Sequence, residues 1–96
     1  MSVDRYAEAE QRYLKSDWAG AVQLLEEVVA ANPDHLEAWV MLAAATRQLS
    51  NLVRSAEAYQ RAIQLDPAES VWRQHLAQVL EQTGRRDQAA AADATV

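Results

Sequence analysis

The chain has 96 residues, a formal net charge of −5 and no cysteine, and half of its residues are apolar. This length suffices for one compact domain, and the composition is typical of a folded protein. The acidic residues are spread along the chain with no basic stripe to collect phosphates, so we expect no nucleic-acid binding. Absence of cysteine excludes disulfides and thiolate catalysis, and it fits the cytoplasm without excluding an exported protein. Apolar runs of only a few residues predict no membrane span.

Apolar residues at helical spacing predict an all-α chain. Two glycines and two prolines interrupt a sequence rich in Ala, Leu, Glu, Gln and Arg, all of which favour helix. In chain order we expect helices at about residues 3–15, 18–31, 35–49, 52–65, 69–83 and 86–95. Each has an apolar stripe on one face and polar residues elsewhere, so each must bury its stripe on a neighbour.

Local signals predict where several of these helices begin and end. Asp34, followed by Glu37, has the pattern of a capping box and would start the third helix. Asp17 and Asn51 are expected to cap the second and fourth helices through their side-chain oxygens. Gly84 can adopt the left-handed conformation that ends a helix, and would separate the fifth helix from a sixth.

Several kinds of residue recur at a step of 34 positions. They are the small residues Ala9, Ala43 and Ala77, the turn residues Ser16, Ser50 and Gly84, and the prolines Pro33 and Pro67. A step shared by several classes of residue indicates an internal repeat. Each unit is predicted to be a pair of antiparallel helices with a short connection. The units would span about residues 2–33, 36–67 and, in truncated form, 70–96.

The middle unit resembles the tetratricopeptide repeat (TPR). The matching residues are Trp39, Leu42, Ala43, Thr46, Ser55, Tyr59, Ala62 and Pro67. The first unit matches less fully, at Ala9, Ala21, Leu25, Val28 and Pro33, and has Arg5, Glu8 and Arg12 where apolar residues are usual. The third unit matches at Leu76, Ala77, Leu80, Gly84 and Ala89. Its Trp72 comes one residue early relative to Trp39, and Ala68 replaces Asp34, so we expect irregular packing there.

The resemblance covers essentially the whole chain. It implies a right-handed α-α superhelix (a TPR solenoid) of antiparallel helix pairs, with about six helices in one domain over residues 1–96. Proteins of this family are scaffolds that bind other proteins and are not themselves catalytic. We therefore expect a non-enzymatic adaptor that binds a peptide or helix of a partner protein in a concave groove, a surface that stacked helix pairs provide.

In TPR arrays the first helix of each unit lines the concave side. By this resemblance the expected partner-binding residues are Tyr6, Glu10, Tyr13, Val40, Met41, Ala44, Arg47, Gln48, Gln74, His75 and Gln78. Val40, Met41 and Ala44 form an apolar face beside the core stripe, which suits a peptide or helix ligand. The alternative is that the inward curve of the array covers these side chains.

One TPR subclass grips the C-terminal carboxylates of chaperones with Lys, Asn and Arg on these faces. The corresponding residues here are Tyr6, Glu10, Met41, Val71 and His75. None supplies the required cation or amide, and Glu10 would repel a carboxylate. We therefore expect no binding of chaperone tails.

We predict no catalytic, cofactor or metal site. His35 and His75 lie 40 residues apart in different expected helices, and His35 and Glu37 point apart at a spacing of two. No glycine-rich phosphate loop is present. Tryptophans at helical spacing, such as Trp39 and Trp72, are expected to pack in the core rather than to form an aromatic cage.

Two other interpretations stay open. The chain could self-associate, or be a piece of a longer array, because a solenoid exposes apolar surface at each end unless it is capped. The last expected helix is mostly alanine, and Tyr6, Tyr13 and Leu14 of the first helix could pair across a dimer. A hydrolase or metalloprotein is the third interpretation.

Overall fold

The computed structural model describes residues 4–94, with side chains described for residues 4–85. This part of the chain is built from five α-helices and contains no strand: α1 (Arg5–Leu14), α2 (Trp18–Ala31), α3 (Leu36–Gln48), α4 (Leu52–Leu65) and α5 (Val71–Ala94). The all-α prediction is confirmed.

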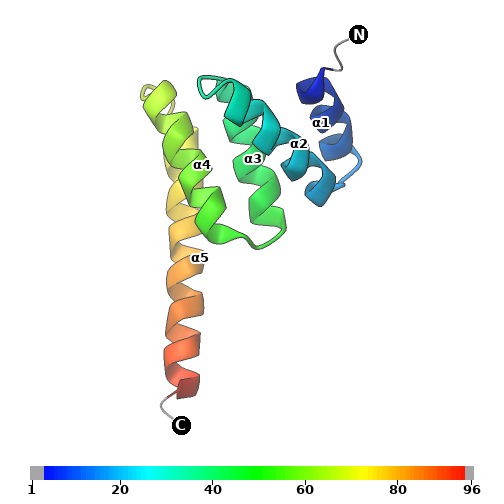
Figure 1. Ribbon diagram of the computed structural model, residues 1–96. Helices are drawn as coiled ribbons and strands as arrows, with labels where there is room; N and C mark the ends of the chain where they lie inside the picture. The colour runs from blue at the N-terminus through cyan, green and yellow to red at the C-terminus, as the bar shows by residue number, and fades with distance from the viewer. Residues whose placement is uncertain (1–3, 95–96) are drawn as a thin grey trace.

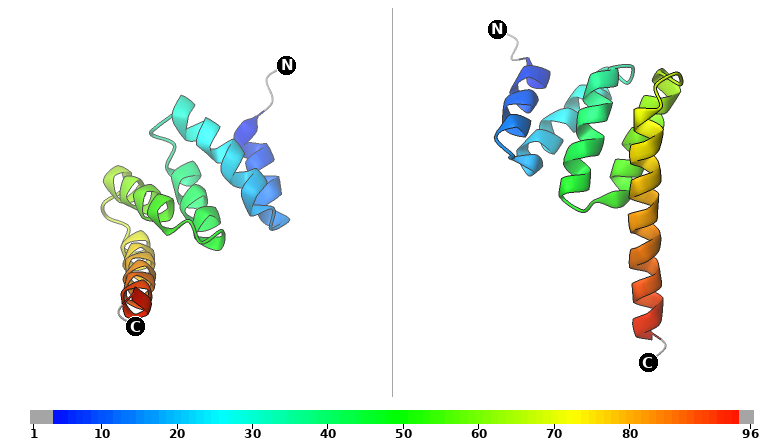
Figure 2. Two further views of the ribbon diagram at one scale, coloured as in Figure 1. Left: turned by 60° about the horizontal axis from the view of Figure 1, so that its bottom comes forward. Right: turned by 180° about the vertical axis from the view of Figure 1, so that it is seen from behind.

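The helices lie in two layers. Each helix packs chiefly on its neighbours in sequence, and α1, α3 and α5 form one side of the molecule while α2 and α4 form the other (Figure 1, Figure 2). The right panel of Figure 2 looks onto the side of α1, α3 and α5. The C-terminal half of α5 continues past the other helices (Figure 1).

Small residues set the close approach of the helices. Ala9 and Ala43, which are 34 positions apart, are both fully buried, and Leu42 packs beside them in the same core. Two buried hydroxyls find partners on the backbone of α3: Ser55 Oγ donates to the carbonyl of Ala43 at 2.8 Å, and Thr46 Oγ1 donates to that of Leu42 at 2.7 Å. The polar groups of this core are therefore satisfied rather than buried at a cost.

The caps predicted for α2 and α4 are confirmed. The side chain of Asp17 accepts a hydrogen bond from the Gly20 amide, and that of Asn51 accepts one from the Arg54 amide. Each bond satisfies one of the amides that a helix start leaves without a partner.

The capping box predicted at Asp34 is wrong. α3 begins one residue later than such a cap requires, and His35 Nδ1 accepts from the Ala38 amide at 3.2 Å. The turn before α3 explains the difference, because the side chain of Asn32 accepts from the Asp34 amide. The carboxylate of Asp34 instead lies 3.4 Å from the guanidinium of Arg61 on α4.

α5 runs straight through Gly84, so the described residues form five helices where the sequence predicted about six. The turns at the two earlier positions of the repeat are left-handed, with φ of 61° at Ser16 and 60° at Ser50. Gly84 could make this turn most easily but stays helical.

The sequence of the third unit explains why the turn is missing. Leu25 and Tyr59 anchor α2 and α4 in the core, with exposed fractions of 0% and 3%. The residue one more step of 34 along the chain is Asp93, whose carboxylate could not fill an apolar site. Without a large apolar side chain to bury, a sixth helix would gain little stability by packing back on α5.

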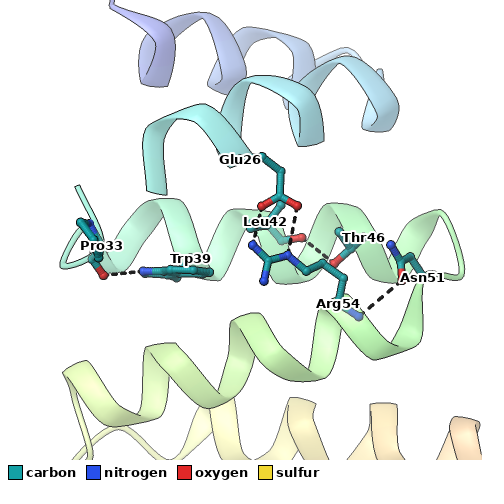
Figure 3. A network of polar contacts seen from close by, with 7 residues as sticks. All are labelled: Glu26, Pro33, Trp39, Leu42, Thr46, Asn51 and Arg54. Atoms are coloured by element: carbon teal, nitrogen blue, oxygen red, sulfur yellow. Dashed lines mark hydrogen bonds and ion pairs between the residues drawn. The ribbon is translucent and has the colours of Figure 1, made fainter. Parts of the chain in front are cut away.

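The connection before α5 keeps one hydrogen bond of the connection before α3 but changes its donor. Trp39 Nε1 donates to the carbonyl of Pro33 at 2.7 Å (Figure 3). Arg73 stands 34 positions after Trp39, and its guanidinium donates to the carbonyl of Pro67. Because Arg73 makes this hydrogen bond, Trp72 is not needed for it, and Trp72 lies on a different face of α5.

A polar network ties α2, α3 and α4 together on the side away from α1 and α5. Arg54 of α4 donates through two nitrogens to the carboxylate of Glu26 on α2, with Nε at 3.0 Å from Oε2 (Figure 3). Its guanidinium also lies 5.4 Å from the ring centroid of Trp39 on α3. The Glu26 carboxylate raises the pKa of Arg54 and keeps it charged. One side chain thereby links three helices.

We expect Arg54→Ala to lower the free energy of unfolding by about 1 to 2 kcal/mol. A bidentate ion pair and a cation–π contact are lost together, and the pair is only partly exposed to solvent. Chemical denaturation followed by circular dichroism measures the change. The control is Arg61→Ala, which removes an ion pair to an Asp34 side chain that is 80% exposed and an exposed hydrogen bond to Gln64, and which should cost under about 0.5 kcal/mol. Equal losses for the two variants would contradict the network's role.

Candidate groove on the face of α1, α3 and α5

Two adjoining hollows form a groove on the side of α1, α3 and α5. Their volumes are about 680 Å³ and 340 Å³, and they share Tyr13, Val40, Ala44 and Trp72. We call their combined surface the groove. Its other lining residues are Tyr6, Leu36, Glu37, Met41, Arg47, Gln48, Tyr59, Val71, His75 and Gln82. All but Tyr59 come from α1, α3 and α5, so three helices in parallel orientation supply almost the whole surface.

The structure brings eight of the eleven predicted groove residues into this surface. They are Tyr6, Tyr13, Val40, Met41, Ala44, Arg47, Gln48 and His75. The other three, Glu10, Gln74 and Gln78, are exposed side chains that do not line either hollow. Gln78 nevertheless contributes indirectly, because its Oε1 accepts a hydrogen bond from Arg47.

Sequence reasoning assigned Trp72 to the core and did not place Tyr59 among the groove residues, and the structure places both in the groove. Trp72 lies 34 positions after Ala38 rather than after Trp39, and a shift of one residue turns a helical side chain by about 100°. The position of Trp72, one residue earlier in its unit than Trp39, is the sequence signal that could have predicted its place in the groove. Tyr59 is 3% exposed, yet its ring forms part of the groove floor and stacks on His75 with 5.6 Å between centroids.

The hollow near the start of α3 is mainly apolar. Val40 and Met41 line it from α3 and Tyr6 lines it from α1. The Tyr6 ring packs on His35, with centroids 4.5 Å apart. Burial raises the pKa of Tyr6, and the carboxylates of Glu10 and Glu37 raise it further, so the hydroxyl stays protonated at neutral pH and can donate a hydrogen bond.

The hollow near the end of α3 is more polar. Arg47 donates to Oε1 of Gln78 at 3.1 Å and of Gln82 at 3.3 Å, which bridges α3 to α5. Burial raises the pKa of Tyr59, an effect that the nearby charge of Arg47 partly offsets. His75 Nδ1 is buried and has no hydrogen-bond partner within residues 4–85. This end of the groove therefore holds a positive charge and an unsatisfied nitrogen.

The two histidines have separate structural roles. His35 caps α3, while His75 stacks on Tyr59. Among the residues whose side chains are described, no three His, Asp or Glu residues lie together as a metal site would require.

Within the residues that the structure describes, no helix combines the length and the apolar character needed to cross a membrane. The sequence matches no family model and no curated protein.

Proposed function

We propose that this chain is a TPR-like adaptor, non-enzymatic and with its helix pairs in a right-handed superhelix, that binds a peptide or helix of a partner protein in the groove. The observation that supports it most is the groove itself, in which Val40, Met41 and Ala44 form an apolar strip between Tyr13 and Trp72. Apolar and aromatic side chains that line a concave surface are what a peptide ligand needs for its anchors.

The same proposal covers the partners that we do not expect. Nucleic acid is a poor ligand for an acidic chain with a formal charge of −5. Chaperone C-terminal tails are excluded from the proposal because Tyr6, Met41 and His75 stand where the carboxylate-binding cations and amides would be needed. A cytoplasmic location is part of the proposal and is supported by the absence of cysteine.

Self-association is the second candidate function, and one observation favours it. Ala43 and Thr46 of α3 are fully buried under α4. Their counterparts on α5, Ala77 and Leu80, are exposed, and Leu80 retains 51% of its surface in contact with solvent. Analytical ultracentrifugation across a range of concentrations distinguishes the two candidates. A strict monomer would remove self-association.

Selection from a random peptide library tests the adaptor function. Peptides displayed on phage and fused at their C-terminal ends should be enriched on the immobilised chain, and their affinities can be measured as free peptides by fluorescence anisotropy. Met41→Glu should lower the affinity for the enriched peptides at least tenfold, because it places a charge in the apolar strip and a bound peptide would remove that charge from water.

The matched control is Gln60→Glu, which adds the same charge to an exposed position of α4 outside the groove and should leave affinity unchanged. Circular dichroism should show unaltered helical content for both variants. Failure to enrich any peptide, or equal affinity of wild type and Met41→Glu, would refute the proposed function.

A further inference from the structure

The two ends of the groove have opposite charge. Glu37 lines the apolar hollow near the start of α3, and its carboxylate and that of Glu10 both raise the pKa of Tyr6, which lines the same hollow. Arg47 lines the other hollow near the end of α3. Glu37 Oε2 lies 3.5 Å from His35 Nδ1, a nitrogen that accepts a hydrogen bond from the Ala38 amide, and the Glu37 side chain is 70% exposed, so its carboxylate is accessible to a ligand.

The charge of Arg47 is not neutralised within residues 4–85. Its hydrogen bonds go to the amide oxygens of Gln78 and Gln82, which are neutral, and no carboxylate in this part of the chain lies within ion-pair distance. These two bonds also hold the guanidinium in place, which reduces the conformational entropy that binding an anion would cost. Arg47 is thus a positioned cation at one end of an apolar strip.

The distance between the two ends follows from the helix. Glu37 and Arg47 are ten residues apart on α3, which corresponds to a rise of about 15 Å. An extended chain covers this distance in roughly four or five residues, and a helical one in about ten. Between the two charges the groove presents Val40, Met41 and Ala44 from the same helix and Trp72 from α5.

We propose that the groove takes a protein segment with a basic side chain at Glu37, apolar side chains along the strip, and an acidic side chain at Arg47. This inference rests on the proposed function and adds the chemistry and orientation of the ligand to it. Opposite charges at the two ends select one direction of the bound segment, because the reverse direction places like charges together at both ends.

The phage-selected peptides test this proposal through double-mutant cycles. In the peptides, the basic and the acidic residue are each replaced by glutamine. In the protein, the variants are Glu37→Gln and Arg47→Gln, which keep the size or hydrogen-bonding capacity of the side chain. The fusion at the C-terminal end of each displayed peptide restricts the selection to side-chain carboxylates.

We expect two specific couplings. Glu37→Gln should weaken binding about two- to fivefold, and this loss should vanish when the peptide has lost its basic residue; Arg47→Gln should couple in the same way to the acidic residue. The controls Glu57→Gln and Arg61→Gln change the same charges on α4 outside the groove and should leave affinity within about twofold.

The outcomes separate the two proposals. Enriched peptides that lack this charge pattern, or that show no coupling to Glu37 and Arg47, overturn the inferred ligand chemistry while the groove stays a binding site. Coupling of the basic residue to Arg47→Gln rather than to Glu37→Gln would overturn it too. If no peptide is enriched, the proposed function fails, and the inference fails with it.

Discussion

Leu25→Ala is expected to lower the free energy of unfolding by about 3 kcal/mol. Leu25 lies on α2 with no exposed surface, and it packs in the core that α2 shares with its neighbours. Its truncation removes buried methyl groups and leaves a cavity, and such changes cost roughly 2 to 5 kcal/mol. For a domain of this size the transition temperature should fall by at least about 12 °C.

The matched control for this variant is Leu14→Ala. The chemical change is identical, but Leu14 is 80% exposed at the end of α1, and its truncation should alter stability by under about 0.5 kcal/mol. Differential scanning calorimetry measures both. A loss at Leu14 as large as that at Leu25 would mean that the α1 surface is buried in solution, as in a dimer that pairs through Tyr6, Tyr13 and Leu14.

Gly84→Pro is expected to break α5 into two parts, and Gly84→Ala to strengthen it. A proline within a helix removes an amide donor and clashes with the preceding turn at a cost of about 3 kcal/mol. Alanine should instead stabilise the helix by about 1 kcal/mol, because Gly84 is helical and a methyl group there meets no atom within 4 Å. Far-ultraviolet circular dichroism should report helix lost for proline and retained or gained for alanine.

The sign of the alanine effect is the informative part of this prediction. If the chain turned at Gly84 as it does at Ser50, with φ near 60°, alanine would be strained there and would lower stability by about 1 kcal/mol. Ala77→Gly is the reverse change at an exposed position of the same helix, and it should destabilise by about 1 kcal/mol. A destabilising Gly84→Ala would contradict a continuous α5.

The sequence predicted the helices best where local chemistry decides them. The bounds of α2 and α4 and their caps at Asp17 and Asn51 agree with the structure because each cap bonds to an amide only three residues away. The cap of α3 was assigned to the wrong residue because Asn32, Asp34 and His35 all offer acceptors, and the turn geometry selects among them. Competition of this kind cannot be resolved from residue preferences alone.

The missing sixth helix and the composition of the groove depend on tertiary packing. Gly84 favours a turn locally, but a turn is stable only if the helix after it has an apolar side chain to bury. At the repeat position where Leu25 and Tyr59 are buried, the third unit has Asp93. The groove was predicted through residues on the first helix of each unit. Tyr59 was not predicted because it lies on α4, and because its ring is almost fully buried while still lining the groove.

The sequential packing of the helices makes the separation of α1 and α5 the most deformable dimension of the molecule. Each helix is held chiefly by its neighbours in the chain, so small rotations at successive helix contacts add together between the two ends. Tyr13 and Trp72, which line both hollows, come from these two end helices. A ligand in the proposed site that touched both residues would connect the two end helices and resist bending of the helix stack.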